Sequence, residues 1–205
     1  MKKRCLILVF VLATSWSAGA CAFNSFETAG AIGEQFVALT FGIGLATTEL
    51  GAGGTWYLVP QGRLAIGLLE GLDLGIQGGW KQPGGEAGAT DWLGILIDVK
   101  ITSAHVPDTY TVAWGAGGGF GLDFLGNGWG VFLQLLYESH APLLPVYVTY
   151  RSILPLDAIT AGSLEFKGYI AGGFCLRLAP IARLLLVADV YEGSMSLGLG
   201  LEVGS

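Results

Sequence analysis

The sequence predicts an all-β fold, an antiparallel up-and-down transmembrane β-barrel of about ten strands that follows an N-terminal signal peptide. Three observations lead to this prediction. The chain combines 34 glycines, 52% hydrophobic residues and only 13% charged residues, which is unusual for a soluble domain. After the first twenty residues, no stretch supplies the roughly 18 apolar residues that a membrane-spanning helix needs. The hydrophobic residues instead alternate with polar or very small ones, which is the period of a β-strand.

The first five predicted strands are bounded by Gly, Pro, Asn and Asp residues and lie near 35–46, 54–69, 72–80, 91–102 and 109–123. In the fourth strand the apolar residues from Leu93 to Ile101 share one face, and Asp98 and Lys100 lie on the other. In the fifth strand one face consists of Ala113, Gly115, Gly117, Gly119 and Gly121. Such a face suits a crowded barrel interior better than water, where each glycine adds backbone entropy that folding must remove.

The last five predicted strands lie near 128–138, 145–152, 165–178, 181–191 and 195–204. The final strand shows the alternation most clearly, because Leu197, Leu199, Leu201 and Val203 interleave with Ser196, Gly198, Gly200 and Glu202. An even number of strands lets an antiparallel barrel close with both of its ends on the same side of the membrane.

The connections predict how the barrel is oriented, because outer-membrane barrels have tight periplasmic turns and longer external loops. With a periplasmic N-terminus, Glu70-Gly71 and Pro180 lie at tight periplasmic turns, and the longer segments 81–90 and 153–164 lie outside. Membrane barrels also concentrate Trp and Tyr at the two headgroup levels. The apolar-face aromatic residues expected there are Trp56, Trp80 and Trp129 at external strand ends, and Tyr110 and Tyr137 at periplasmic ends.

The first twenty residues have the three parts of a secretory signal. Basic Lys2-Lys3-Arg4 precedes an apolar run from Leu6 to Ala13, and small residues precede Cys21. The apolar run is too short to span about 30 Å of hydrocarbon. We therefore expect a signal peptide over 1–20, a periplasmic N-terminal linker over 21–34 and an outer-membrane β-barrel over 35–205.

Residues Ala18-Gly19-Ala20-Cys21 resemble a bacterial lipobox, although Ala18 stands where that motif prefers Leu. The resemblance implies that Cys21 becomes a lipidated first residue, and Ala22 resembles the pattern for sorting to the outer membrane. Ordinary cleavage after Ala20, which leaves Cys21 unmodified, is the alternative. We expect Cys175 to be a small buried or lumen-facing residue.

The hairpin over 62–75, together with the later strand that contains Asp98-Val99-Lys100, resembles a pattern common in predicted bacterial outer-membrane barrels. The resemblance implies the bacterial cell outer membrane as location, with outer-membrane lipids and the barrel-assembly machinery as partners. The chain departs from that family at Glu202-Val203-Gly204-Ser205, where many such barrels end on an aromatic residue.

Ten charged residues are predicted to face the lumen: Asp73, Asp98, Lys100, Glu138, Arg151, Lys167, Arg177, Arg183, Asp189 and Glu202. The two signs are present in similar numbers, so we expect these side chains to neutralise one another. This pattern favours a non-enzymatic outer-membrane barrel with a structural role or a role in passage of a small solute. A soluble, lipid-anchored ligand-binding β-barrel, with its apolar face inward, is one alternative.

An outer-membrane esterase or acyltransferase that modifies lipids is the second alternative, with Ser139 and His140 as the nearest candidates. Adjacent strand residues point to opposite faces, so these two would not readily pair. His105 and His140 are isolated in the sequence, and no Cys/His cluster has metal-ligand spacing. We therefore expect no catalytic residues, no metal site and no cofactor. The formal charge of −6 argues against nucleic acid as a partner.

Overall fold

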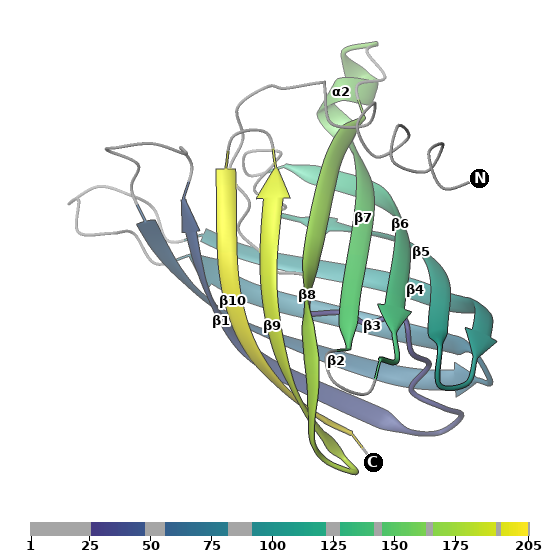
Figure 1. The fold of residues 1–205 in the computed structure, drawn as a ribbon. Coiled ribbons are helices and arrows are strands. Elements are labelled where there is room, and N and C mark those ends of the chain that lie inside the picture. Colours follow the sequence, from purple (N-terminus) through teal and green to yellow (C-terminus); the bar gives the residue numbers. More distant parts are fainter. Residues whose placement is uncertain are drawn as a thin grey trace, which may run out of the picture.

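The computed structural model describes residues 26–47, 56–81, 92–121, 128–141, 145–162, 166–191 and 194–204. The predicted signal peptide, the candidate lipidation site Cys21 and the start of the predicted linker lie outside these residues. In the described part the strands form a closed barrel in which each strand pairs antiparallel with the next (Figure 1). The first and last strands close the ring, with Phe41 opposite Leu201 and Gly42 opposite Gly200.

The ten strands are β1 (Val37–Thr47), β2 (Trp56–Leu69), β3 (Leu72–Lys81), β4 (Trp92–Val106), β5 (Tyr110–Phe120), β6 (Trp129–Ser139), β7 (Val146–Pro155), β8 (Lys167–Ala179), β9 (Ala182–Tyr191) and β10 (Ser194–Gly204). These strands confirm the predicted ten-stranded, antiparallel up-and-down barrel. Most predicted boundaries agree to within a few residues. A five-residue helix, α2 (Leu156–Thr160), follows β7 inside the segment predicted as a loop.

The barrel has two distinct ends. The "turn end" contains the start of β1, the end of β10 and the connections after β2, β4, β6 and β8. The "loop end" contains the remaining connections and α2, which lies opposite the C-terminus in Figure 1. None of the helices in the described segments has the length and hydropathy that crossing a membrane would require.

The side chains are sorted between the outside and the inside of the barrel. On β10, Leu199 and Leu201 are 46% and 42% exposed, whereas Gly200 between them is buried. On β6, Leu133 and Tyr137 point outward, and Gln134 is buried in the lumen. Soluble barrels place their apolar side chains inside and their polar side chains outside. This barrel has an apolar outer face, and its interior holds polar side chains together with a buried apolar cluster that includes Leu96, Phe132 and Tyr147.

Strand β4 extends four residues beyond its predicted end, and its register shifts between Thr102 and Ala104. Before the shift, the odd-numbered residues Ile97 and Ile101 point outward. A bulge inserts one unpaired residue and so reverses which face the following side chains occupy. After the shift, His105 lies opposite Thr111, whose side chain is buried in the lumen.

Candidate functional site

A segment that belongs to no strand lies inside the barrel. We call Phe26–Ile32 the "lumen segment". Its first four residues are at most 3% exposed, and the purple trace that precedes β1 in Figure 1 runs within the ring of strands. Sequence analysis assigned these residues to a periplasmic linker and did not anticipate that they would enter the lumen.

The chain enters the lumen at the turn end. The Gln35 amide donates a hydrogen bond to the Gly67 carbonyl at 3.0 Å, and the Gly67 amide donates one to the Phe36 carbonyl at 3.0 Å. Gly33 has a φ of 98°, which L side chains rarely adopt, and this conformation lets the chain reverse direction. A Cβ atom at Gly67 would collide with the Gly33 carbonyl. Both glycines are therefore needed at this close approach.

The opposite end of the lumen segment reaches the middle of the barrel. The Phe26 ring packs against Gly42 of β1 and Gly200 of β10, and a Cβ atom at Gly42 would overlap it. Both glycines lie about halfway along their strands. The lumen segment thus runs from the turn end to mid-depth, and glycines in the wall make room for its one aromatic side chain.

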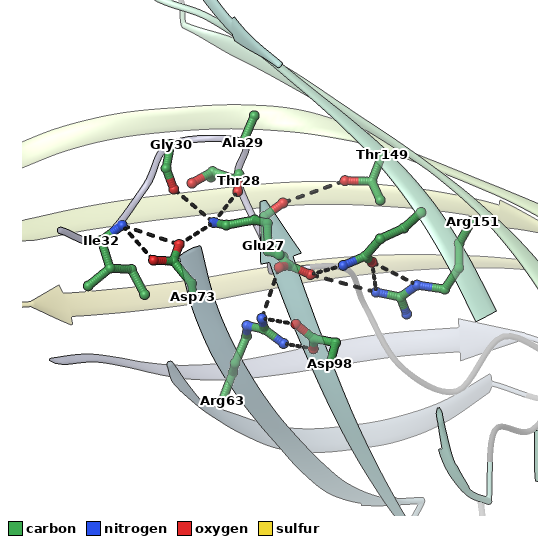
Figure 2. Close-up of polar contacts among 12 residues, drawn as sticks. Glu27, Thr28, Ala29, Gly30, Ile32, Arg63, Asp73, Asp98, Thr149 and Arg151 are labelled. Carbon is green, nitrogen blue, oxygen red and sulfur yellow. Dashed lines mark hydrogen bonds and ion pairs between the residues drawn. The ribbon is translucent and has the colours of Figure 1, made fainter. Parts of the chain in front are cut away.

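Glu27 connects the lumen segment to the wall through charged groups (Figure 2). Its Oε1 atom ion-pairs with Nη2 of Arg63 at 2.9 Å, and its Oε2 atom accepts a hydrogen bond from Gln134 at 2.9 Å. Arg63 also donates to both carboxylate oxygens of Asp98, at 2.5 and 2.8 Å. Arg151 lies 4.0 Å from Glu27. Removing one partner from such a buried network leaves an uncompensated charge, which typically costs about 3–5 kcal/mol.

The remaining wall contacts hold the backbone of the lumen segment. The Lys100 ammonium donates to the carbonyls of Thr28 at 2.9 Å and Gly30 at 2.8 Å and ion-pairs with Asp73 at 3.1 Å. Asp73 in turn accepts from the Ile32 amide at 3.3 Å. These contacts satisfy backbone groups of an irregular segment that would otherwise be buried without partners.

Two further clusters of polar side chains lie on the wall. The Glu138 carboxylate accepts from the Gly30 amide at 2.9 Å and lies 3.6 Å from Arg183, whose Nε donates to Glu202 at 2.7 Å. Asp189 accepts hydrogen bonds from Tyr169 and from Ser196. In the described part of the lumen, acidic and basic side chains therefore meet partners of opposite charge or hydrogen-bond donors.

The predicted lumen residues occupy different environments. Six of them are buried inside the barrel: Asp73, Asp98, Lys100, Glu138, Arg151 and Asp189. Arg183 and Glu202 are partly exposed and paired with each other, Lys167 is half-buried, and Arg177 is exposed near the turn end. Sequence reasoning missed Glu27, Arg63 and Gln134. Arg63 and Gln134 lie on the inward face of strands that were predicted correctly, so strand parity could have found both.

The predicted interface aromatics lie at the barrel ends. Trp56, Trp80 and Trp129 are exposed at the loop end, where the Phe120 and Trp129 rings lie 5.5 Å apart. At the turn end, half-buried Tyr110 stacks on exposed Tyr137 with ring centroids 6.1 Å apart.

A small cavity adjoins the lumen segment. A cavity of about 10 Å³ lies beside it, which is roughly the room that one water molecule needs. Its lining includes Thr40, Ala65 and Arg183.

The candidate catalytic pair is not arranged as a nucleophile and base in the described contacts. Ser139 Oγ accepts from the Ala141 amide at 3.4 Å, whereas His140 Nε2 lies 2.7 Å from Thr111 Oγ1. Within the described segments, no group of three or more His, Cys, Asp or Glu residues is arranged to hold a metal ion. Cys175 is buried and has a free thiol.

No protein-family model and no curated protein matches the chain. Several solved structures are similar to it. A de novo designed transmembrane β-barrel is 12% identical, with a TM-score of 0.37, over 84% of this chain and 97% of the other. The N-terminal β-barrel domain of Pseudomonas aeruginosa OprF is 10% identical, with a TM-score of 0.38, over 84% and 99%. The Yersinia pestis attachment invasion locus protein Ail is 11% identical, with a TM-score of 0.31, over 83% and 97%.

Proposed function

We propose that this chain is an integral protein of the bacterial outer membrane, a β-barrel whose lumen is closed by its own N-terminal segment and which has a structural, non-enzymatic role. One observation carries this proposal. The lumen segment lies inside the barrel and is tied to the wall through Glu27, Lys100 and Asp73.

The apolar outer surface supports the membrane location. Every strand presents large apolar side chains outward, among them Phe41, Ile97, Leu133 and Leu199. A soluble protein rarely exposes such a continuous apolar surface, whereas a membrane barrel needs an apolar band between aromatic residues at both headgroup levels. Burying this surface in acyl chains is favourable by roughly 25 cal/mol per Å².

The occupied lumen supports a structural role in preference to solute passage. A barrel of about eight strands has an interior that side chains alone can fill, and ten strands enclose only slightly more space. Here the additional space is taken by Phe26, Glu27 and Ala29, each of which is almost fully buried. The charged side chains are paired with opposite charges, as Arg63 is with Asp98, so they do not form a row of like charges that would attract an ion through the lumen.

Conductance across planar lipid bilayers tests the closed state. Refolded full-length protein should insert and give no unitary conductance above that of the empty bilayer, over a range of voltages and salts. Steady unitary conductance from the wild-type protein would contradict closure. Insertion itself is checked independently by heat-modifiable migration in detergent gels and by resistance to carbonate extraction, so failure to insert is distinguished from a closed lumen.

Orientation and the non-enzymatic role have their own tests. In a Cys175→Ser background, which by itself measures any labelling of Cys21, Asp157→Cys at the loop end should react with a membrane-impermeant maleimide on intact cells. A cysteine in place of Asp108 at the turn end should react only after the outer membrane is permeabilised. The lipid A acylation profile should be the same with the wild-type protein and with Ser139→Ala.

A further inference from the structure

Two histidines that are far apart in the sequence meet at the turn end of the barrel. His105 Nδ1 lies 2.8 Å from the Thr111 hydroxyl, and His140 Nε2 lies 2.7 Å from the same oxygen. The two rings are in edge-on contact, with centroids 5.7 Å apart. These are the only two histidines in the chain.

The bulge in β4 is what brings His105 to this position. Without the register shift between Thr102 and Ala104, His105 would continue the outward face of Ile97 and Ile101. After the shift it lies directly opposite Thr111 on β5. Bulges are over-represented at the rims of barrels and beside functional sites because they re-aim a side chain.

His140 reaches the same point from the end of β6. The buried residues Gln134, Leu136 and Glu138 show that even-numbered positions of this strand face inward, and His140 continues that face. Its backbone amide donates to the Thr109 carbonyl at 3.0 Å, which holds it against the turn between β4 and β5. Three adjacent strands therefore position the two imidazoles and the hydroxyl.

The chemistry of the pair suits a transition metal. Imidazole nitrogen is the commonest protein ligand for such ions, and affinity along the first-row divalent series is highest for Cu²⁺. Two nitrogens on opposite sides of one ion are about 4 Å apart, twice the usual bond length of roughly 2 Å. Because these nitrogens lie 2.8 and 2.7 Å from one shared oxygen, they are at most 5.5 Å apart, and both are within reach of a single ion. His105 is exposed and His140 half-buried, so an ion has access from solvent.

We propose that His105 and His140 form a two-imidazole site for a divalent late transition-metal ion, Cu²⁺ above all, at the turn end of the barrel. The Thr111 hydroxyl and water supply the oxygen ligands that Cu²⁺ accepts alongside imidazole. The contacts that hold His105, Thr111 and His140 together do not involve Glu27 or Arg63, so the copper titration tests this site separately from closure of the lumen.

The test is a titration of the untagged full chain, folded in detergent micelles, with Cu²⁺ alone. We expect saturable binding of one ion per chain, and an electron paramagnetic resonance spectrum with hyperfine coupling from two imidazole nitrogens. His105→Gln and His140→Gln should each show one nitrogen and an association constant lower by about tenfold or more, the scale of losing a supporting group at a metal site. Thr111→Val, which keeps both imidazoles, should keep the two-nitrogen signal.

Three outcomes would overturn the proposal: no saturable binding, a one-nitrogen signal in the wild-type chain, or unchanged affinity in the variant that lacks both histidines. The last would mean that carboxylates bind the ion. Heat-modifiable migration shows whether each variant is folded. The wild-type spectrum alone counts the nitrogens, so a variant that fails to fold still leaves a decisive measurement.

Discussion

The Arg63 guanidinium ion-pairs with Glu27 at 2.9 Å, and this contact joins the wall of the barrel to the segment that fills it. Because Arg63 also binds Asp98, one cation compensates two buried carboxylates.

Replacing Arg63 by Met should therefore destabilise the barrel strongly. Glu27 and Asp98 would both lose their closest cation, and such a loss from a buried network costs about 3–5 kcal/mol. Urea unfolding in detergent, followed by heat-modifiable migration, measures the change. Arg177→Met is the matched control, because Arg177 is exposed and surface substitutions usually change stability by less than about 0.5 kcal/mol. Equal effects of the two substitutions would show that the network contributes little.

Reversing the charge of Glu27 should loosen the lumen segment. In Glu27→Lys an ammonium faces Arg63 and Arg151, and like charges in a buried site repel strongly. We expect openings in planar bilayers that the wild-type protein lacks. Glu34→Lys makes the same charge change at an exposed position between the lumen segment and β1, and it should give no openings. Identical traces from both variants would argue against the lumen segment as the closing element.

A side chain at Gly42 should displace the Phe26 ring. The Cβ of Gly42→Ala would overlap that ring, whereas at Gly62 of β2 the nearest atoms would be an ordinary 3.7 Å away. Overpacking costs typically about 1–3 kcal/mol, so Gly42→Ala should lower the unfolding free energy by that amount and Gly62→Ala by much less.

The double variant Phe26→Ala, Gly42→Ala identifies the cause of that loss. If the ring is responsible, the two substitutions together should cost less than the sum of the single costs. If the two costs are additive, the loss of stability in Gly42→Ala does not come from contact with the Phe26 ring.

A lysine on the outer surface should lower the free energy of unfolding more at the middle of a strand than near its end. Leu199 lies at the middle of β10, and Val203 lies near the turn end. Lysine at the bilayer midplane of a membrane barrel costs about 2–4 kcal/mol, falling to about 0–1 near the interface. Unfolding from lipid vesicles should therefore show a larger loss for Leu199→Lys than for Val203→Lys. The reverse order would be incompatible with the proposed position in the membrane.

The strands could be predicted because their information is local. Alternation such as that of Leu197 to Glu202 specifies both the strand and its two faces. The shift between Thr102 and Ala104 could not be predicted in this way, since it depends on how β4 pairs with β5. The predicted strand ended at residue 102, so His105 lay outside it, and the two histidines were interpreted as isolated. Helix α2 has only five residues, too few to show a helical period.

The lumen segment could not be predicted from its own residues. Phe26–Ile32 has no alternation, and it is fixed by groups far away in the sequence, such as Arg63, Lys100 and Glu138. A short irregular stretch before the first strand is usually a linker. The sequence does contain the groups on the wall that bind the lumen segment, because the inward face of the strands carries Arg63 and Gln134 beside many glycines.

The position of the lumen segment also determines the order in which the molecule can assemble. Glu27 is synthesised before every strand it binds. The Thr149 hydroxyl, which donates a hydrogen bond to the Glu27 carbonyl, lies 122 residues further along the chain. Bringing such distant groups together costs loop entropy that only many simultaneous contacts recover. The Phe26 ring packs against Gly200 of β10, so the lumen segment can complete its contacts only after the last strand is in place.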